Sequence, residues 1–209
     1  MKSPRDNEPL PPQFMGTLAF LPPHAHGNRS LTWWGMMGLV AIESTAFVLA
    51  IAAYFYLATH SAEWPPDQLV PSVAAGNVFS VISVLSLIPN LWLKRVAEAE
   101  KLKQVQIGLI VMSVVGLALM PVRYFEFASM HVSWADSAYG SIVITILALH
   151  TVHLVTDLYD TLVLTALMFT KHAKGRRFVD VAENALYWNF VVVAWFPIYA
   201  VLYLAPRFL

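Results

Sequence analysis

The chain has 209 residues, of which 58% are hydrophobic and only 12% are charged. A soluble domain is about half apolar and about a quarter charged, so this composition favours a membrane protein. Thirteen basic and thirteen acidic residues balance, which argues against a nucleic-acid partner, and the absence of cysteine excludes disulfides and thiolate metal sites.

Residues 1–32 are predicted to form a polar, proline-rich tail. The segment lacks the short apolar core and the small-residue cleavage site of a signal peptide. The remaining residues, 33–209, are predicted to form one membrane domain.

Five apolar runs follow the tail, each long enough as a helix to cross a hydrocarbon core of about 30 Å. They predict an all-α integral membrane bundle with spans over residues 33–57, 72–93, 105–122, 138–170 and 182–204. Pro89 is expected to kink the second span, and Pro121 is expected to end the third. The fourth run would be about 50 Å long as a helix, so it must tilt or protrude.

The distribution of Lys and Arg predicts the orientation. Eleven of the thirteen fall in the tail, the second connection and the fourth connection, and two fall on the other side. The positive-inside rule places the eleven in the cytoplasm, with the N-terminus. Five spans then place the C-terminus outside.

Glu43 lies ten residues into the first span, far from either end. An ionisable side chain near the bilayer centre costs about 2.5–3.5 kcal/mol, so it needs a partner, a cavity or a role. Two interpretations stay open: a protonated carboxyl bonded to another helix, or a proton-linked or lipid-linked carboxyl.

The fourth span carries His150, His153, Asp157 and Asp160, whose spacing of three, four and three predicts one helical stripe facing protein. The four groups could satisfy one another and the neighbouring helices. They could instead hold a phospholipid headgroup together with nearby basic residues. A metal site is the third interpretation, because His and carboxylate are sound ligands. However, the Glu-x-x-His motif of di-iron bundles is absent.

Other polar residues of the spans have ordinary structural explanations. Arg123 and Glu126, three residues apart, are expected to form a salt bridge at the outer end of the third span. Glu183 would stabilise the N-terminus of the fifth helix through the macrodipole. Tyr187 and Trp188 are expected to act as hydrogen-bonding packing groups. A haem held by two histidines would need a further intramembrane His, so no redox centre, catalytic residue or metal site is predicted in this chain.

Five segments, taken in order, resemble the subunit III family of haem–copper terminal oxidases across residues 33–205. They are the stretch around Glu43, Trp64-Pro65-Pro66, Arg123-Tyr124-Phe125-Glu126, Ser137-Ala-Tyr-Gly-Ser141 with His150-x-x-His153, and Tyr187-Trp188-Asn189-Phe190-Val191 with Trp195. The likeness is to a short, five-helix bacterial type.

The resemblance implies a non-catalytic accessory subunit in a bacterial inner membrane, part of a cytochrome c or quinol oxidase of the aerobic respiratory chain. Such a subunit packs on catalytic subunit I beside other oxidase subunits, binds phospholipid, and supports proton uptake and lasting turnover. Haem and copper would lie in the partner subunits, with no cofactor in this chain. Glu43, His150, His153, Asp157, Arg123 and Glu126 would then be lipid-binding or proton-linked residues, with Glu183, Tyr187, Trp188 and Trp195 as structural motif residues.

The chain also departs from the family pattern. Asn189 and Val192 replace the usual His and Asp, and Asp157 and Asp160 are additions. These departures leave a subunit III-like accessory protein of a nitric oxide reductase as an alternative. A stand-alone membrane metal-binding protein is a further alternative. A transporter is disfavoured because five spans give no inverted repeat.

Overall fold

The computed structural model describes residues 31–66, 71–170 and 176–208, so the predicted tail lies almost wholly outside the described part. These residues contain five helices long and apolar enough to cross a membrane, and no strand. The helices are α2 (Leu31–His60), α3 (Val73–Glu98), α4 (Leu102–Ser129), α5 (Ala138–Met168) and α6 (Arg176–Tyr199). A π-helical turn, η2 (Ala200–Leu204), and a 3₁₀ turn, η3 (Ala205–Arg207), continue α6. The predicted all-α, five-span class is confirmed, and the orientation stays a prediction.

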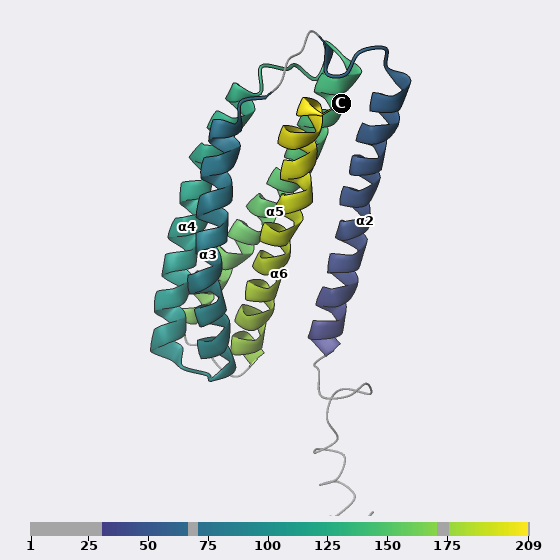
Figure 1. Cartoon of the computed structure of the whole chain (residues 1–209). Coiled ribbons are helices and arrows are strands. Elements are labelled where there is room, and N and C mark those ends of the chain that lie inside the picture. Colours follow the sequence, from purple (N-terminus) through teal and green to yellow (C-terminus); the bar gives the residue numbers. More distant parts are fainter. Residues whose placement is uncertain (1–30, 67–70, 171–175, 209) are drawn as a thin grey trace, which may run out of the picture.

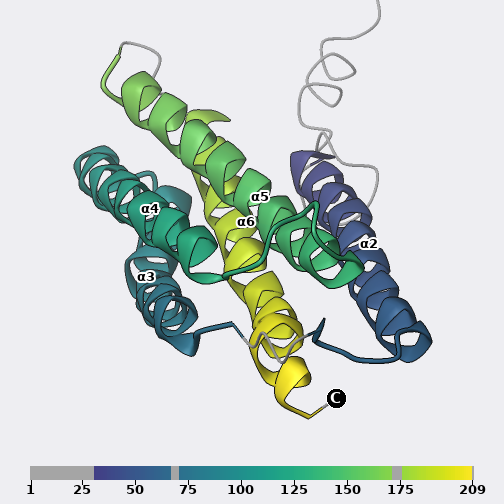
Figure 2. The same cartoon turned by 90° about the horizontal axis from the view of Figure 1, so that it is seen from above.

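The helices run side by side, with α6 in contact with α2, α3 and α5 (Figures 1 and 2). Helices α3 and α4 lie on one side of α6, and α2 lies on the other side against α5 and α6. One end of the bundle carries the start of α2, the α3–α4 turn and the start of α6 (Figure 1). We call it the basic end, because Lys94, Arg95, Lys101, Lys103 and Arg177 lie there.

Small residues of α3 allow α6 and η2 to approach closely. A Cβ added to Gly76 would lie 2.6 Å from the Tyr203 ring, so only glycine leaves room for that ring. Trp195 donates its indole N–H to the Ser80 hydroxyl over 2.7 Å. Close helix contact through small residues, reinforced by interhelical hydrogen bonds, is typical of membrane bundles.

Aromatic rings pack together at the end of the bundle opposite the basic end. Trp64, in the α2–α3 connection, packs edge-on against Tyr54 and Tyr139, with ring centroids 5.2 and 5.0 Å apart. Tyr54, near the end of α2, is fully buried in this core. A Cβ added to Gly140 would lie 2.1 Å from the carbonyl oxygen of Ser133, in the connection between α4 and α5. Glycine at this position therefore lets the first turn of α5 pack against that connection.

The helices extend beyond several predicted limits. Helix α4 continues through Pro121 to Ser129, and α3 continues nine residues past Pro89, so the predicted stop at Pro121 is wrong. Membrane helices tolerate proline because neighbouring helices and local adjustments satisfy the freed backbone groups. Helix α6 begins at Arg176, so Glu183 lies seven residues inside it and the macrodipole explanation is wrong.

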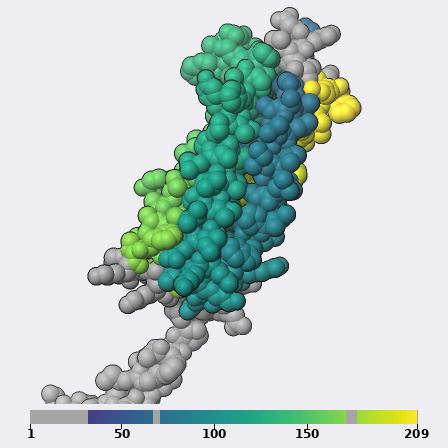
Figure 3. Space-filling view, turned by 90° about the vertical axis from the view of Figure 1, so that its left-hand side faces the viewer, coloured from purple at the N-terminus to yellow at the C-terminus, as the bar shows by residue number. Residues whose placement is uncertain are grey.

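The outer surfaces of the helices are mainly apolar. Figure 3 shows the face built by α3 and α4. Side chains exposed on these two helices include Val81, Leu85, Ile88, Ile107 and Val114. Only 6% of the apolar stretch of α2 is buried inside the protein, against 50% for the last span. Most of the α2 surface is therefore available to lipid or to another chain.

Candidate functional site: two polar centres within the bundle

The first polar centre is a buried group that we call the arginine cluster: Arg123, Glu126, His150 and Tyr203. The Arg123 Nη1 lies 2.6 Å from Glu126 Oε2, and its Nη2 lies 2.9 Å from His150 Nδ1. The Tyr203 hydroxyl donates to the other carboxylate oxygen of Glu126 over 2.5 Å. The four side chains come from α4, α5 and η2, and each is at most 2% exposed.

Aromatic rings complete the surroundings of the Arg123 guanidinium. Its Cζ lies 3.7 Å from the centroid of Phe79 on α3 and 4.5 Å from the ring of Trp195 on α6. A desolvated cation over such rings gains about 2 kcal/mol or more from each good contact. The predicted Arg123–Glu126 salt bridge is confirmed within α4, and the other contacts of the Arg123 guanidinium reach α3, α5 and α6.

Hydrogen bonding fixes the tautomer of His150. Its Nδ1 must accept, because the Arg123 guanidinium can only donate. Its Nε2 therefore carries the proton and donates to the Val191 carbonyl over 3.0 Å. Both ring nitrogens are occupied, so His150 has no lone pair free for a metal or a haem iron.

The second polar centre lies at Glu43 and His153, where α2 meets α5. The His153 Nε2 lies 3.8 Å from Glu43 Oε1, while its Nδ1 lies 2.6 Å from the Leu149 carbonyl oxygen. Because Nδ1 donates there, Nε2 of a neutral ring presents a lone pair to Glu43. The other oxygen of Glu43, Oε2, is buried without a hydrogen-bond partner. His153 is therefore the residue of another helix that faces Glu43, at a distance longer than a hydrogen bond.

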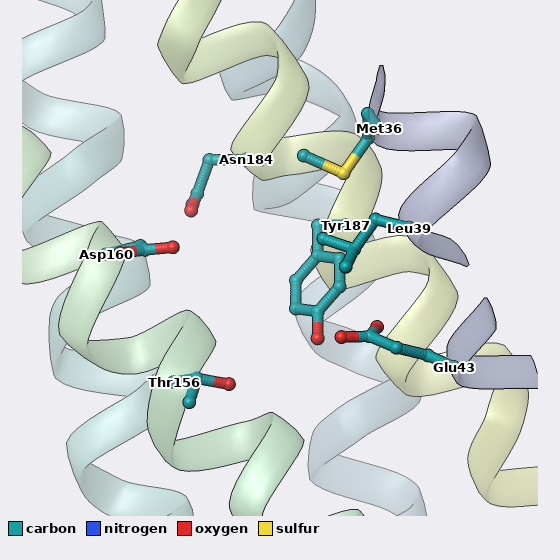
Figure 4. Close-up of a pocket in the computed structure, with 7 residues that line it drawn as sticks. All are labelled: Met36, Leu39, Glu43, Thr156, Asp160, Asn184 and Tyr187. Atoms are coloured by element: carbon teal, nitrogen blue, oxygen red, sulfur yellow. The ribbon is translucent and has the colours of Figure 1, made fainter. Parts of the chain in front are cut away.

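Glu43 also lines a cavity of about 200 Å³ between α2, α5 and α6, which we call the acidic cleft. Figure 4 shows polar groups from all three helices directed toward this space. The lining residues are Met36, Leu39, Glu43, Thr156, Asp160, Asn184 and Tyr187. Asn184 donates its amide to Thr161 Oγ1 over 2.9 Å, so its carbonyl oxygen is the group left for the cleft.

The predicted stripe on α5 is divided between different surroundings. His150, His153 and Asp157 are buried, with 1%, 8% and 0% exposure, whereas Asp160 is exposed and lines the cleft. Asp160 is thus the one member of the stripe that lies on a hollow between the helices rather than in the core. Both oxygens of Asp157 lack a hydrogen-bond partner. In the described part of the chain, no three His, Cys, Asp or Glu side chains converge as metal ligands do.

The motif residues of α6 connect it to α3. Trp188 donates to the Ser86 hydroxyl over 2.8 Å. The amide of Asn90 donates to Asn189 Oδ1 over 2.9 Å and to the Ala185 carbonyl over 2.7 Å. Asn189 thus has a structural partner. The sequence analysis missed Asn90, although a lone amide in an apolar span was a usable signal.

Sequence reasoning also missed two parts of the polar centres, Tyr203 and Asn184. Tyr203 reads as an interfacial aromatic at the end of a span, and the π-helical turn that directs it inward has no sequence signature. Tyr187, singled out from the sequence, lies beside Glu43 and Thr156 in the cleft (Figure 4).

Comparison with known proteins gives two matches. The family described as cytochrome c oxidase subunit III matches residues 20–206. The protein named cytochrome c oxidase subunit 3 of Thermostichus vulcanus is 19% identical over 188 residues, which cover 88% of this chain and 92% of that relative.

Proposed function

Because the chain belongs to the cytochrome c oxidase subunit III family, we propose that it is a non-catalytic accessory subunit of a haem–copper terminal oxidase. The observation that carries this proposal is the family match over residues 20–206, which includes all five helices. The chain is a multi-pass membrane protein, and we place it in a bacterial inner membrane with its basic end toward the cytoplasm.

The hydrogen bonding of the histidines supports an accessory role. His150 uses both ring nitrogens inside the arginine cluster, and His153 uses one nitrogen on its own helix and turns the other toward Glu43. Haem and copper would therefore belong to a partner chain, which we propose is the catalytic subunit I. The exposed apolar surfaces provide room for that subunit and for phospholipid.

Purification in a mild detergent tests this assignment. The tagged chain is expected to elute with a large haem-bearing subunit and with oxygen-reducing activity, whereas the isolated chain should show no haem absorbance. Recovery of the pure chain without a haem protein would contradict the proposal. Recovery with the catalytic subunit of a nitric oxide reductase would also contradict it.

We further propose that Glu43 and His153 support proton uptake and lasting turnover of the complex. Glu43 is a carboxyl midway along α2 with one buried oxygen unpaired, and it faces His153, whose Nδ1 is bonded to its own helix. Glu43→Ala is expected to lower the number of turnovers completed before inactivation, with haem content unchanged. Thr45→Ala, at an exposed position on the same helix, is the matched control. Loss of haem in Glu43→Ala would refute this role.

A further inference from the structure

We propose that the acidic cleft is a water-accessible vestibule that selects a small monovalent cation, such as a hydrated proton or an ammonium group, and leads it from the basic end to Glu43. The inference extends the proton-linked role proposed for Glu43. It depends on the geometry of the cleft, and its test measures cation access rather than oxidase activity.

The groups that line the cleft are suited to a cation. Glu43 and Asp160 contribute carboxylates, and no Lys or Arg of the described part of the chain lines the cleft. The Asn184 amide is already used by Thr161, so it offers a carbonyl oxygen. Among the described residues, no ion pair involves Asp160. The phosphate of a lipid headgroup would meet two carboxylates and no basic side chain there, so an anionic ligand is disfavoured.

Asp157 provides a second, independent observation. It follows Thr156 on α5 and lies one turn before Asp160; these two neighbours line the cleft, whereas Asp157 itself is not one of the lining residues. The side chain is 0% exposed, and neither carboxylate oxygen has a hydrogen-bond partner. Burial of a carboxyl group without a partner is costly. A cation in the adjacent cleft would offset part of that cost.

A second hollow joins the cleft to the basic end of the bundle. It has a volume of about 260 Å³ and shares Met36, Asp160 and Asn184 with the cleft. Beyond these it reaches Asp180 and Glu183 in the first turns of α6. The only basic residue that lines this hollow, within the described chain, is Arg177, which is paired with Asp180 at 3.0 Å. Acidic groups therefore follow the route from the helix end to Glu43.

Phe47 closes the route on the far side of Glu43. Its ring is 5% exposed, lies 4.8 Å from the His153 ring and lies 6.2 Å from the His150 ring, centroid to centroid. This phenyl ring separates Glu43 and His153 from the arginine cluster. The cleft is therefore closed by a buried ring on the side of the arginine cluster, which suits uptake and exchange of a cation at Glu43 rather than its passage onward to that cluster.

The size of the cleft defines the class of ligand. A water molecule occupies about 30 Å³ in the liquid, so about 200 Å³ has room for a small hydrated cation or a primary ammonium group. Mg²⁺ and Ca²⁺ require six or more oxygen ligands in a defined shell. Within the described residues no cluster of three or more ligating side chains provides one.

Cysteine accessibility tests the proposal directly, because the chain contains no cysteine. Asn184→Cys places a thiol in the cleft, and Ser83→Cys, at a 2% exposed position on α3, serves as the closed control. Both full-length variants are labelled in sealed membranes of either orientation. Two methanethiosulfonate reagents are used, one bearing a cationic trimethylammonium group and one bearing an anionic sulfonate. The labelling rate of each reagent is divided by its rate with a free thiol in solution, which removes the difference in intrinsic reactivity.

We expect Asn184→Cys to react from the basic-end side only, and about tenfold faster with the cationic reagent, since a cleft of one charge sign concentrates counter-ions by tenfold or more. Asp160→Asn in the same chain should bring the two rates close together, and Ser83→Cys should react with neither reagent. Equal rates for both reagents, reaction from the other side, or no reaction would overturn the proposal. If Asn184→Cys does not fold, Thr156→Cys replaces it.

Two competition arms identify the source of the cation. Slower labelling when soluble ethylammonium is added indicates that the cation comes from water. Slower labelling in vesicles of phosphatidylethanolamine than in vesicles of phosphatidylcholine, which has the same net charge but no primary ammonium, indicates the ammonium of a lipid headgroup. Cation-selective labelling in a chain that purifies without an oxidase would overturn the assignment of function and leave the vestibule intact.

Discussion

Separating the two charges of the arginine cluster is expected to destabilise the protein more than removing both together. Arg123→Met leaves the Glu126 carboxylate buried with Tyr203 as its only partner, and it also removes the guanidinium from the Phe79 ring 3.7 Å away. Loss of one partner of a buried ion pair costs about 3–5 kcal/mol. Glu126→Gln keeps an oxygen that can accept from Arg123, so its cost should be about 2–3 kcal/mol.

The double variant Arg123→Met/Glu126→Gln contains no uncompensated charge in the cluster. We expect it to recover about 2 kcal/mol relative to the sum of the single variants, within the range of coupling energies for residues in contact. Detergent-induced unfolding followed by tryptophan fluorescence measures the cycle, because Trp195 lies 4.5 Å from the guanidinium.

The exposed pair of Arg177 and Asp180 is the matched control, since its side chains are 41% and 26% exposed and also lie three residues apart. Arg177→Met and Asp180→Asn should couple by less than about 1 kcal/mol, as surface pairs do. Additive effects within about 0.5 kcal/mol at Arg123 and Glu126 would refute the conclusion that the cluster depends on charge compensation.

Four further variants test three sites and one control position by the same unfolding assay. Gly76→Ala is expected to destabilise the protein because its Cβ would meet a tyrosine ring of η2 at 2.6 Å, whereas Gly35→Ala, with nothing within 4 Å, should be neutral or slightly stabilising. Asp157→Asn should change the free energy of unfolding by less than about 1 kcal/mol, because no hydrogen bond is lost; a larger loss would reveal a partner. Trp195→Phe should cost more than about 1 kcal/mol, because it removes the bond to Ser80 and also leaves a smaller ring beside the Arg123 guanidinium; no change would mean that neither contact contributes.

The number of spans could be predicted from the sequence because each hydrocarbon crossing requires about 20 apolar residues, and five runs meet that requirement. The helix ends could not be predicted in the same way. Composition changes where the chain leaves the apolar run, but α4 continues past Pro121 as far as Ser129 and includes the Arg123–Glu126 pair in its last turns. Hydrophobic run length locates the membrane core, whereas hydrogen bonding decides where a helix ends.

The polar centres were only partly predictable for a related reason. Helical spacing correctly predicts that His150, His153 and Asp157 share one side of α5, because that relation lies within one helix. The partners come from other helices: Arg123 reaches His150 from α4, and Glu43 reaches His153 from α2. Such pairings depend on how the helices pack, which a single sequence does not specify.

The two polar centres differ in how fully their hydrogen-bonding groups are satisfied, and that difference separates structure from function. In the arginine cluster a single donor, the Nε of Arg123, lacks a partner, so substitutions there should lower stability first. Around the acidic cleft, Glu43 Oε2 and both oxygens of Asp157 are buried without partners. These groups contribute no bond to the fold, and local violations of this kind mark functional sites. Substitutions at Glu43 or Asp157 that preserve the free energy of unfolding while altering cation access or turnover would establish the cleft as the working part of this subunit.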